Sequence, residues 1–159
     1  MMNRLTTGKL LGFTILRVMI GWHFLYEGLV KAFDPAWTSK EFLLYSVGPF
    51  SPVFQFLGKN GSLLQVVDIL NIAGLVLIGF LLFVGLFNRV ALIPGIILLL
   101  LYYLAYPPFI GLPVPPQLDG HYLIINNHLI EAAALYILHL FPTSHLTGLA
   151  GLSGSRLIR

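Results

Sequence analysis

The fold class is decided by residues 62–87, SLLQVVDILNIAGLVLIGFLLFVGLF, in which Asp68 is the only charged side chain. A helix rises about 1.5 Å per residue, so this stretch is long enough to cross the roughly 30 Å hydrocarbon core of a bilayer. Residues 10–33, 90–106 and 122–141 form three further apolar stretches that we interpret in the same way. The sequence therefore predicts an all-α membrane protein, a bundle of four transmembrane helices.

The composition also favours lipid over water. Of the 159 residues, 57% are hydrophobic and 9% are charged, whereas soluble domains carry roughly a quarter charged residues. We expect one domain over residues 1–159, with no separate soluble catalytic domain. The Lys and Arg residues are scattered, which excludes a nucleic-acid-binding surface. Cysteine is absent, so redox chemistry needs a bound cofactor or a partner.

The positions of the basic residues predict the orientation. Arg4 and Lys9 precede the first apolar stretch, Arg89 separates the second from the third, and Arg156 and Arg159 follow the fourth. Cytoplasmic loops carry an excess of Lys and Arg. We therefore expect a multi-pass protein of a bacterial cytoplasmic (inner) membrane with both termini on the cytoplasmic side.

The segment between the first two stretches is expected to form two short interfacial helices. Thr38 and Glu41 have the spacing of a capping box, which starts the first helix. Ser51 as N-cap, with Pro52 at the first helical position, starts the second, which ends near Gly58. Their apolar faces would lie at the membrane interface as a lid.

Ionisable side chains within the apolar stretches cost about 3 kcal/mol each on insertion scales, so they indicate partners, water or function. Counting along the helices places most of the polar residues at one depth, in the outer half of the bundle. We predict a polar pocket there. The residues expected to handle protons in it are Glu27, Glu131, His128 and His23. Those expected to bind a ligand are Arg17, Lys31, Trp37, Asp68, Asn71, Tyr103 and Asn127.

Other roles for the same residues stay open. Ion pairs such as Lys31 with Asp68 or Glu27 would lock helices together, and an aromatic belt accounts for Trp37 and Tyr103. The spacing of His and Glu on the first and fourth helices also suggests a metal or haem. A di-iron bundle requires more carboxylates, however, and we predict no bound metal.

With these residues placed, the sequence resembles the DoxX/DoxD family of small four-helix membrane proteins. The motifs that carry the resemblance are FLYEG at 24–28 with Lys31, WTS at 37–39, GPF at 48–50, DILN at 68–71, YYL at 102–104, PPF at 107–109 and NHLIEA at 127–132. His128 stands where the family commonly has another polar residue, such as Lys. The DoxD branch resembles the small subunit of thiosulfate:quinone oxidoreductase.

The resemblance implies a membrane subunit of a quinone-linked oxidoreductase. Such a subunit passes electrons from a small reduced compound, for example a sulfur compound, or from a partner redox subunit to quinone as cofactor. Two other functions remain open, a carrier for a small anion or a proton and a non-catalytic membrane anchor or assembly subunit. Glycines in the apolar stretches would also allow two copies to pack as a homo-oligomer.

Overall fold

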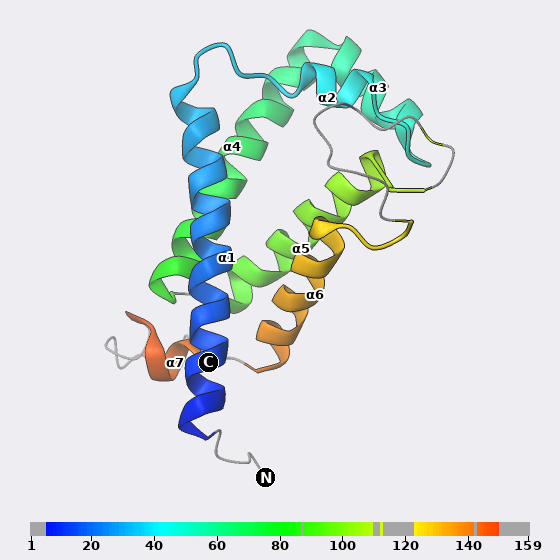
Figure 1. Cartoon of the computed structure of the whole chain (residues 1–159). Helices are drawn as coiled ribbons and strands as arrows, with labels where there is room; N and C mark the ends of the chain where they lie inside the picture. The colour runs from blue at the N-terminus through cyan, green and yellow to red at the C-terminus, as the bar shows by residue number, and fades with distance from the viewer. Residues whose placement is uncertain (1–5, 87, 110–111, 113–122, 142, 150–159) are drawn as a thin grey trace.

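A computed structural model of the chain describes residues 6–86, 88–109, 112, 123–141 and 143–149. Within these residues all regular structure is helical (Figure 1), so the all-α prediction is confirmed. The four long helices are α1 (Thr7–Phe33), α4 (Gly61–Val84), α5 (Asn88–Ala105) and α6 (Asn127–Leu140). The short helices are α2 (Lys40–Leu44), α3 (Ser51–Lys59) and α7 (Ser144–Thr147).

Among the described helices, α4 alone is long and apolar enough to cross a membrane by length and composition. The apolar part of α5, Val90–Ala105, is shorter. The 27 residues of α1 are interrupted by ionisable side chains, and the 14 residues of α6 rise only about 21 Å. The structure therefore indicates one clear candidate span.

Helices α1 and α4 form a closely packed pair because glycines bring their backbones together. A Cβ atom added to Gly79 of α4 would lie 2.2 Å from the backbone nitrogen of Leu25 on α1. One added to Gly21 of α1 would lie 2.5 Å from the backbone nitrogen of Phe83 on α4. No side chain fits between the two helices at these points, which is a typical use of small residues in helix packing.

Helices α5 and α6 form a second pair, and α4 joins it to α1. The shared core consists of aliphatic side chains from each element, among them Ile20, Ile78, Leu82, Leu92, Leu99 and Leu135. In Figure 1 the ribbons of α1 and of the α5–α6 pair lie far apart at the end of the molecule that carries α2 and α3. This end holds the candidate site described below.

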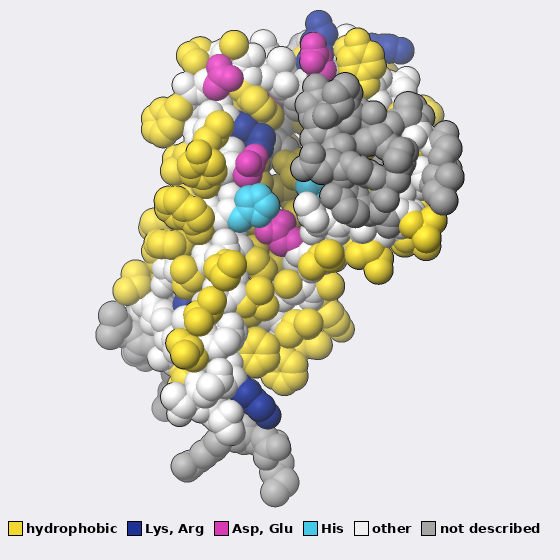
Figure 2. Space-filling view, in the orientation of Figure 1, with side chains coloured by type: hydrophobic (Ala, Val, Ile, Leu, Met, Phe, Trp, Pro, Cys, Tyr) yellow, Lys and Arg dark blue, Asp and Glu magenta, His cyan; other side chains and the backbone are white. Residues whose placement is uncertain are grey.

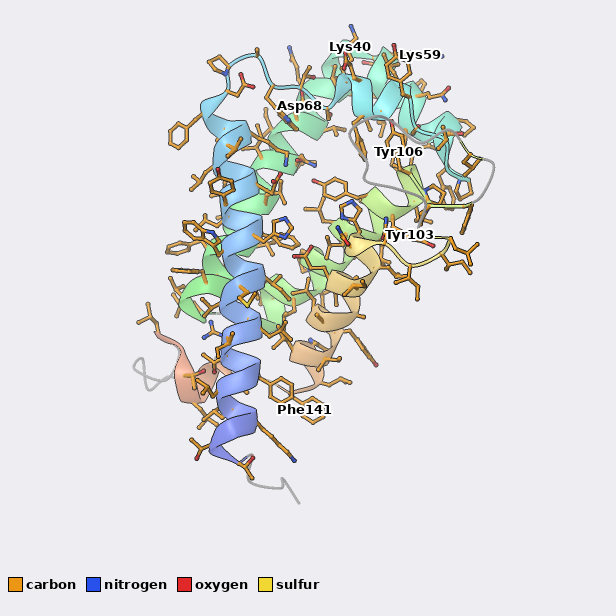
Figure 3. All side chains as sticks on the ribbon, in the orientation of Figure 1. Lys40, Lys59, Asp68, Tyr103, Tyr106 and Phe141 are labelled. Atoms are coloured by element: carbon orange, nitrogen blue, oxygen red, sulfur yellow. The ribbon has the colours of Figure 1, made fainter. Side chains whose placement is uncertain are left out.

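At the opposite end, α1 extends beyond the bundle. Gly8 and Gly12 have no neighbouring atom within reach of an added Cβ. The C-terminal segment lies against the next turns, where Phe13 stacks on Phe141 with ring centroids 5.4 Å apart (Figure 3). The Thr14 hydroxyl also donates a hydrogen bond of 2.8 Å to Thr147.

The two short helices between α1 and α4 are confirmed, but the predicted capping box is wrong. Helix α2 has Ser39 as its N-cap, and the Ser39 side chain makes no capping hydrogen bond. Thr38 instead donates its hydroxyl to the carboxylate of Asp68 at 2.8 Å. Helix α3 follows Phe50 as its N-cap and ends one residue beyond Gly58.

The long helices differ from the predicted stretches mainly at their ends. Asn126 caps α6, since its side-chain oxygen accepts the backbone N–H of Leu129 at 3.1 Å. The residues just before this cap are not helical, so the prediction of a helix from 122 was wrong there; Tyr122 itself lies outside the described residues. Helix α4 ends before residue 87 because Gly85 adopts a left-handed conformation with φ of 74°.

Hydrogen bonds fix α2 and α3 over the C-terminal end of α5. The backbone N–H groups of Val47 and Gly48 both donate to the carbonyl of Ala105, at 3.1 and 3.0 Å. The hydroxyl of Tyr106 donates to the carbonyl of Phe42 at 2.8 Å. The α2–α3 segment is thereby held beside the open end of the bundle.

The outer face of α1 is apolar along its whole length. Its exposed large side chains recur every three or four residues, and they are Leu11, Ile15, Met19, Trp22, Tyr26, Val30 and Phe33. Soluble helices present the opposite arrangement, with polar residues outward. Figure 2 shows these hydrophobic side chains beside a row of acidic, basic and histidine side chains.

Candidate functional site

The site starts from a polar row on α1. His23, Glu27 and Lys31 recur at intervals of four residues and therefore share one helix face. The ammonium group of Lys31 donates to the carboxylate of Glu27 at 2.7 Å. It also lies 5.8 Å from the ring centroid of Trp37, within the range of a cation–π contact. Trp37 thus packs beside the Lys31 end of the row.

A second ion pair connects the row to α6. The Nδ1 atom of His23 lies 2.8 Å from a carboxylate oxygen of Glu131. The side chain of His23 is 58% exposed, whereas that of Glu131 is 14% exposed. His128 precedes Glu131 by three residues and therefore lies on the same face of α6. This face is turned toward α1.

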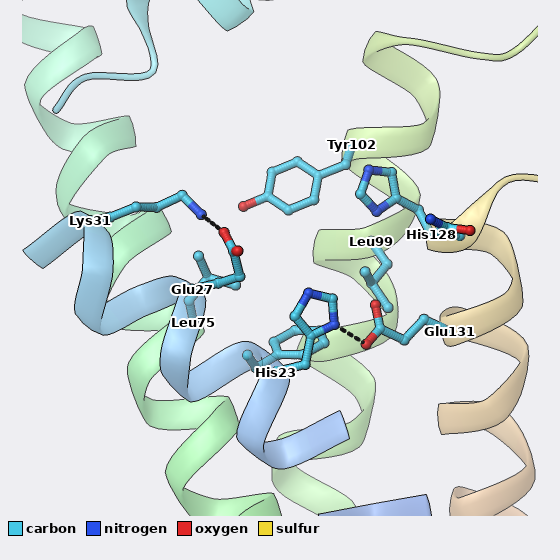
Figure 4. A pocket seen from close by; sticks show the side chains of 10 residues that line it. His23, Glu27, Lys31, Leu75, Leu99, Tyr102, His128 and Glu131 are labelled. Atoms are coloured by element: carbon cyan, nitrogen blue, oxygen red, sulfur yellow. Dashed lines mark hydrogen bonds and ion pairs between the residues drawn. The ribbon is translucent and has the colours of Figure 1, made fainter. Parts of the chain in front are cut away.

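These side chains surround a pocket of about 290 Å³ (Figure 4). Its described lining consists of His23, Phe24, Glu27, Lys31, Leu75, Leu99, Tyr102, Asn127, His128 and Glu131. Small-molecule sites usually measure roughly 300–1,000 Å³. The pocket therefore suits one ring-sized group rather than a large ligand.

Five polar side chains of the pocket form two neighbouring clusters. Figure 4 shows the Lys31–Glu27 pair and the Tyr102 hydroxyl on one side and the His23–Glu131 pair on the other. We call them the Lys31 cluster and the His23 cluster. The apolar side chains of Phe24, Leu75 and Leu99 complete the lining. An occupant can thus form hydrogen bonds with the polar groups of either cluster and apolar contacts with these three side chains.

The formal charge of the lining is low. Lys31 contributes one positive charge, and Glu27 and Glu131 contribute two negative charges. The lining therefore carries a net charge of −1 with both histidines neutral, and 0 with one of them protonated. This balance favours a neutral occupant over an anion. The described residues contain no group of three or more His, Asp or Glu side chains arranged to hold a metal ion.

Tyr102 is a pocket residue that sequence reasoning missed, since it selected the neighbouring Tyr103. Successive helix residues point about 100° apart, and Tyr103 instead donates its hydroxyl to the carbonyl of Ile124 at 2.9 Å. The usable signal was helical spacing, because Tyr102 follows the buried Leu99 by three residues. Asn71 reaches the site indirectly, by donating to the Tyr102 hydroxyl at 2.6 Å.

Asp68 lies outside the described lining of the pocket. Its carboxylate accepts hydrogen bonds from the hydroxyls of Thr38 and Ser39 and from the backbone N–H of Ser39 (Figure 3). These bonds attach the connection between α1 and α2 to α4. The structure thus gives Asp68 a positioning contact, and Lys31 pairs with Glu27 instead.

Arg17 also lies outside the described lining, at the opposite end of α4. Its side chain is 2% exposed. The guanidinium donates to the carbonyls of Leu82 and Phe83, in the last turn of α4. Helix ends leave carbonyl groups without intrahelical partners and carry partial negative charge, which a cation stabilises. This contact explains the burial of Arg17 without a ligand.

The structure therefore brings together six of the residues expected at the site, namely His23, Glu27, Lys31, Asn127, His128 and Glu131. Trp37 and Asn71 contact members of this group. No protein-family model, curated protein or solved structure matches the chain. The resemblance to the DoxX/DoxD family stays a prediction from the sequence motifs.

Proposed function

We propose that this chain is the membrane subunit of a quinone-linked oxidoreductase of the DoxX/DoxD type, and that the pocket between α1 and α6 binds a quinone ring. The observation that carries the proposal is a pocket that combines polar side chains of α1, α5 and α6 with the apolar side chains of Phe24, Leu75 and Leu99. A 1,4-quinone has the matching pattern, with two carbonyl oxygens at opposite edges of a flat apolar ring.

The dimensions support this match. The pocket measures about 290 Å³, close to the lower end of the roughly 300–1,000 Å³ that is typical of small-molecule sites. This volume suits a single quinone ring.

The side chains also suit the chemistry. A bound quinone would take up two electrons and two protons to give hydroquinone, with the electrons supplied by a reduced small molecule, such as a sulfur compound, or by a partner redox subunit. Lys31 places positive charge beside one carbonyl position. His23 and Glu131 hold a proton between imidazole and carboxylate beside the other.

The proposal places α1, α4, α5 and α6 across a bacterial cytoplasmic membrane, with both termini inside and α2 and α3 at the outer interface. The apolar outer face of α1 and the length of α4 support it. The short α6 is extended by the exposed Leu123, Ile124 and Ile125. Tyr103 satisfies the carbonyl of Ile124 there, as non-helical backbone at membrane depth requires.

Access to the pocket would be sideways from the lipid. Helices α1 and α6 contact each other sparsely, in contrast to the close packing of α1 on α4. The exposed side chain of His23 lies where α1 faces α6. A lipid-soluble ligand can therefore approach between these two helices.

A non-catalytic membrane anchor is the second candidate, favoured by the His23–Glu131 pair because it links α1 to α6. A carrier for a small anion is less well supported, since the described lining of the pocket has no net positive charge unless both histidines are protonated.

The deciding experiment is to purify the protein in mild detergent and measure co-purifying quinone by mass spectrometry and metals by elemental analysis. We expect up to one quinone per chain in the wild type and its loss from Glu27→Gln and Glu131→Gln. Glu41→Gln is the matched control, because Glu41 is exposed on α2. A wild type without quinone, even when quinone is supplied, would favour the anchor.

A further inference from the structure

The hydroxyl of Tyr102 uses only part of its hydrogen-bonding capacity. It accepts the side-chain N–H of Asn71 at 2.6 Å. A phenol has one O–H donor as well as its acceptor sites, and within the described residues no acceptor is bonded to this hydrogen. An unused donor in a partly buried site is costly. The Tyr102 hydrogen is therefore available to an occupant of the pocket.

The position of the hydroxyl is fixed from three helices. Asn71 of α4 donates to the oxygen, and two other rings contact the tyrosine ring. The ring of Phe42 on α2 packs edge-on with centroids 5.7 Å apart. The ring of His128 on α6 lies 5.5 Å away. A donor held in this way loses little freedom when a ligand binds.

The direction of the hydroxyl is visible in Figure 4, where it points across the pocket toward the Lys31–Glu27 pair. Glu27 already accepts the Lys31 ammonium through Oε2. The ammonium and the phenol thus present two donors to the same side of the pocket. Two converging donors suit an oxygen atom with two lone pairs, such as a carbonyl oxygen.

We propose that Tyr102, oriented by Asn71, is the specificity-determining donor of the pocket and selects a neutral ligand through a hydrogen bond to its carbonyl oxygen. This inference rests on the proposed quinone site and names the group that recognises one end of the ring. The low formal charge of the lining agrees with a neutral ligand. Asn71 is a positioning residue, since it acts on Tyr102 rather than on the ligand.

The test measures binding of decylubiquinone to the full chain in detergent by equilibrium dialysis. Loss of one hydrogen bond in Tyr102→Phe should weaken binding about three- to tenfold. Asn71→Leu should weaken it by a smaller factor, because the phenol remains but is no longer held. Tyr136→Phe is the matched control, since Tyr136 is exposed on α6, and its affinity should equal that of the wild type.

A spectroscopic readout separates this role from a general effect on folding. Infrared difference spectra of decylubiquinone with ¹³C-labelled carbonyls should show one carbonyl band shifted to lower frequency in the wild type. In Tyr102→Phe that band should return toward the position of the free quinone. Thermal unfolding of each variant identifies any that fails to fold, and the smaller Asn71→Leu change then provides the comparison.

The outcomes are distinct. Equal affinity and an unchanged carbonyl band in folded Tyr102→Phe would overturn the role of Tyr102 and leave the quinone site standing. A wild type that binds no decylubiquinone would overturn both proposals. Weaker binding together with the band shift would support both.

Discussion

Two parts of the molecule bury charge in different ways. Arg17 is almost completely buried, and its guanidinium donates to backbone carbonyls at the end of α4. The pocket residues Glu27, Lys31 and Glu131 are paired with other side chains and border a cavity. A ligand could replace the backbone carbonyls as partners of Arg17 only if the end of α4 changed its structure. The side-chain pairs beside the cavity can rearrange to bind a ligand without such a change.

We infer that a charged side chain within an apolar helix indicates a binding site only when it lines a cavity. Both kinds of charge appear alike in the sequence, because insertion costs alone mark each as unusual. Their surroundings separate the backbone contacts of Arg17 from the ligand-binding role that we propose for the pocket residues. The following substitutions test this division.

The largest effect on stability is expected for Arg17→Met. It removes charged hydrogen bonds to buried carbonyls and should lower the free energy of unfolding by about 2 to 3 kcal/mol. Quinone content per folded chain should stay at the wild-type value. Denaturant unfolding in detergent measures the first quantity, and Lys9→Met, on the exposed start of α1, is the control. A selective loss of quinone from a stable Arg17→Met would contradict the division.

Asp68→Asn should have an intermediate effect, about 1 to 2 kcal/mol, because it weakens charge-assisted bonds from Thr38 and Ser39. The connection between α1 and α2 should then become more accessible to protease. Limited proteolysis and unfolding measure the two effects. Asp34→Asn is the control, since Asp34 is exposed and its carboxylate accepts a local hydrogen bond, from the backbone N–H of Ala36. Equal effects of the two substitutions would show that the Asp68 bonds do not hold the segment.

Glu131→Gln should lower stability by only about 0.5 to 1 kcal/mol, as measured for polar pairs between membrane helices, and should still abolish quinone retention. Glu131→Gln should thus change quinone content strongly and stability weakly, whereas Arg17→Met should change stability strongly and leave quinone content unchanged. Unfolding and quinone content are measured on the same preparation. If Glu131→Gln lowered the free energy of unfolding by several kcal/mol and left the quinone content unchanged, the role of the His23–Glu131 pair would be structural.

No effect on quinone binding is expected for Tyr103→Phe. It removes a single hydrogen bond to Ile124, worth about 0.5 to 1.5 kcal/mol, and leaves decylubiquinone affinity unchanged. Comparison with Tyr102→Phe tests whether the pocket distinguishes two adjacent tyrosines. Weaker binding in Tyr103→Phe but not in Tyr102→Phe would show that Tyr103, and not Tyr102, contacts the ligand.

The helices and most pocket residues were predictable because they depend on local patterns. Apolar length predicted the four long helices, and the spacing of His23, Glu27 and Lys31 predicted their shared face. The start of α6 was misplaced because hydropathy continues through residues 123–125, whereas the helix begins only after its N-cap, Asn126.

Long-range contacts account for the remaining differences. Thr38 pairs with Asp68, thirty residues away, so a local capping pattern could not predict its role. The position of Arg17 at the end of α4 depends on how α1 is aligned along α4. The packing of the two helices determines this alignment. The choice between Tyr102 and Tyr103 depends on the rotation of α5 against α4 and α6.

The glycine contact between α1 and α4 has a mechanical consequence. Where the backbones of α1 and α4 are in contact, no change of side-chain rotamer can alter the distance between the two helices. The pair therefore behaves as one rigid unit. Widening of the pocket must then come from a swing of the α5–α6 pair. Spin-label distances between α1 and α4 should stay constant on addition of decylubiquinone, while those between α1 and α6 change. The rigid α1–α4 pair thus fixes one wall of the pocket, and any change in the width of the pocket comes from movement of the α5–α6 pair.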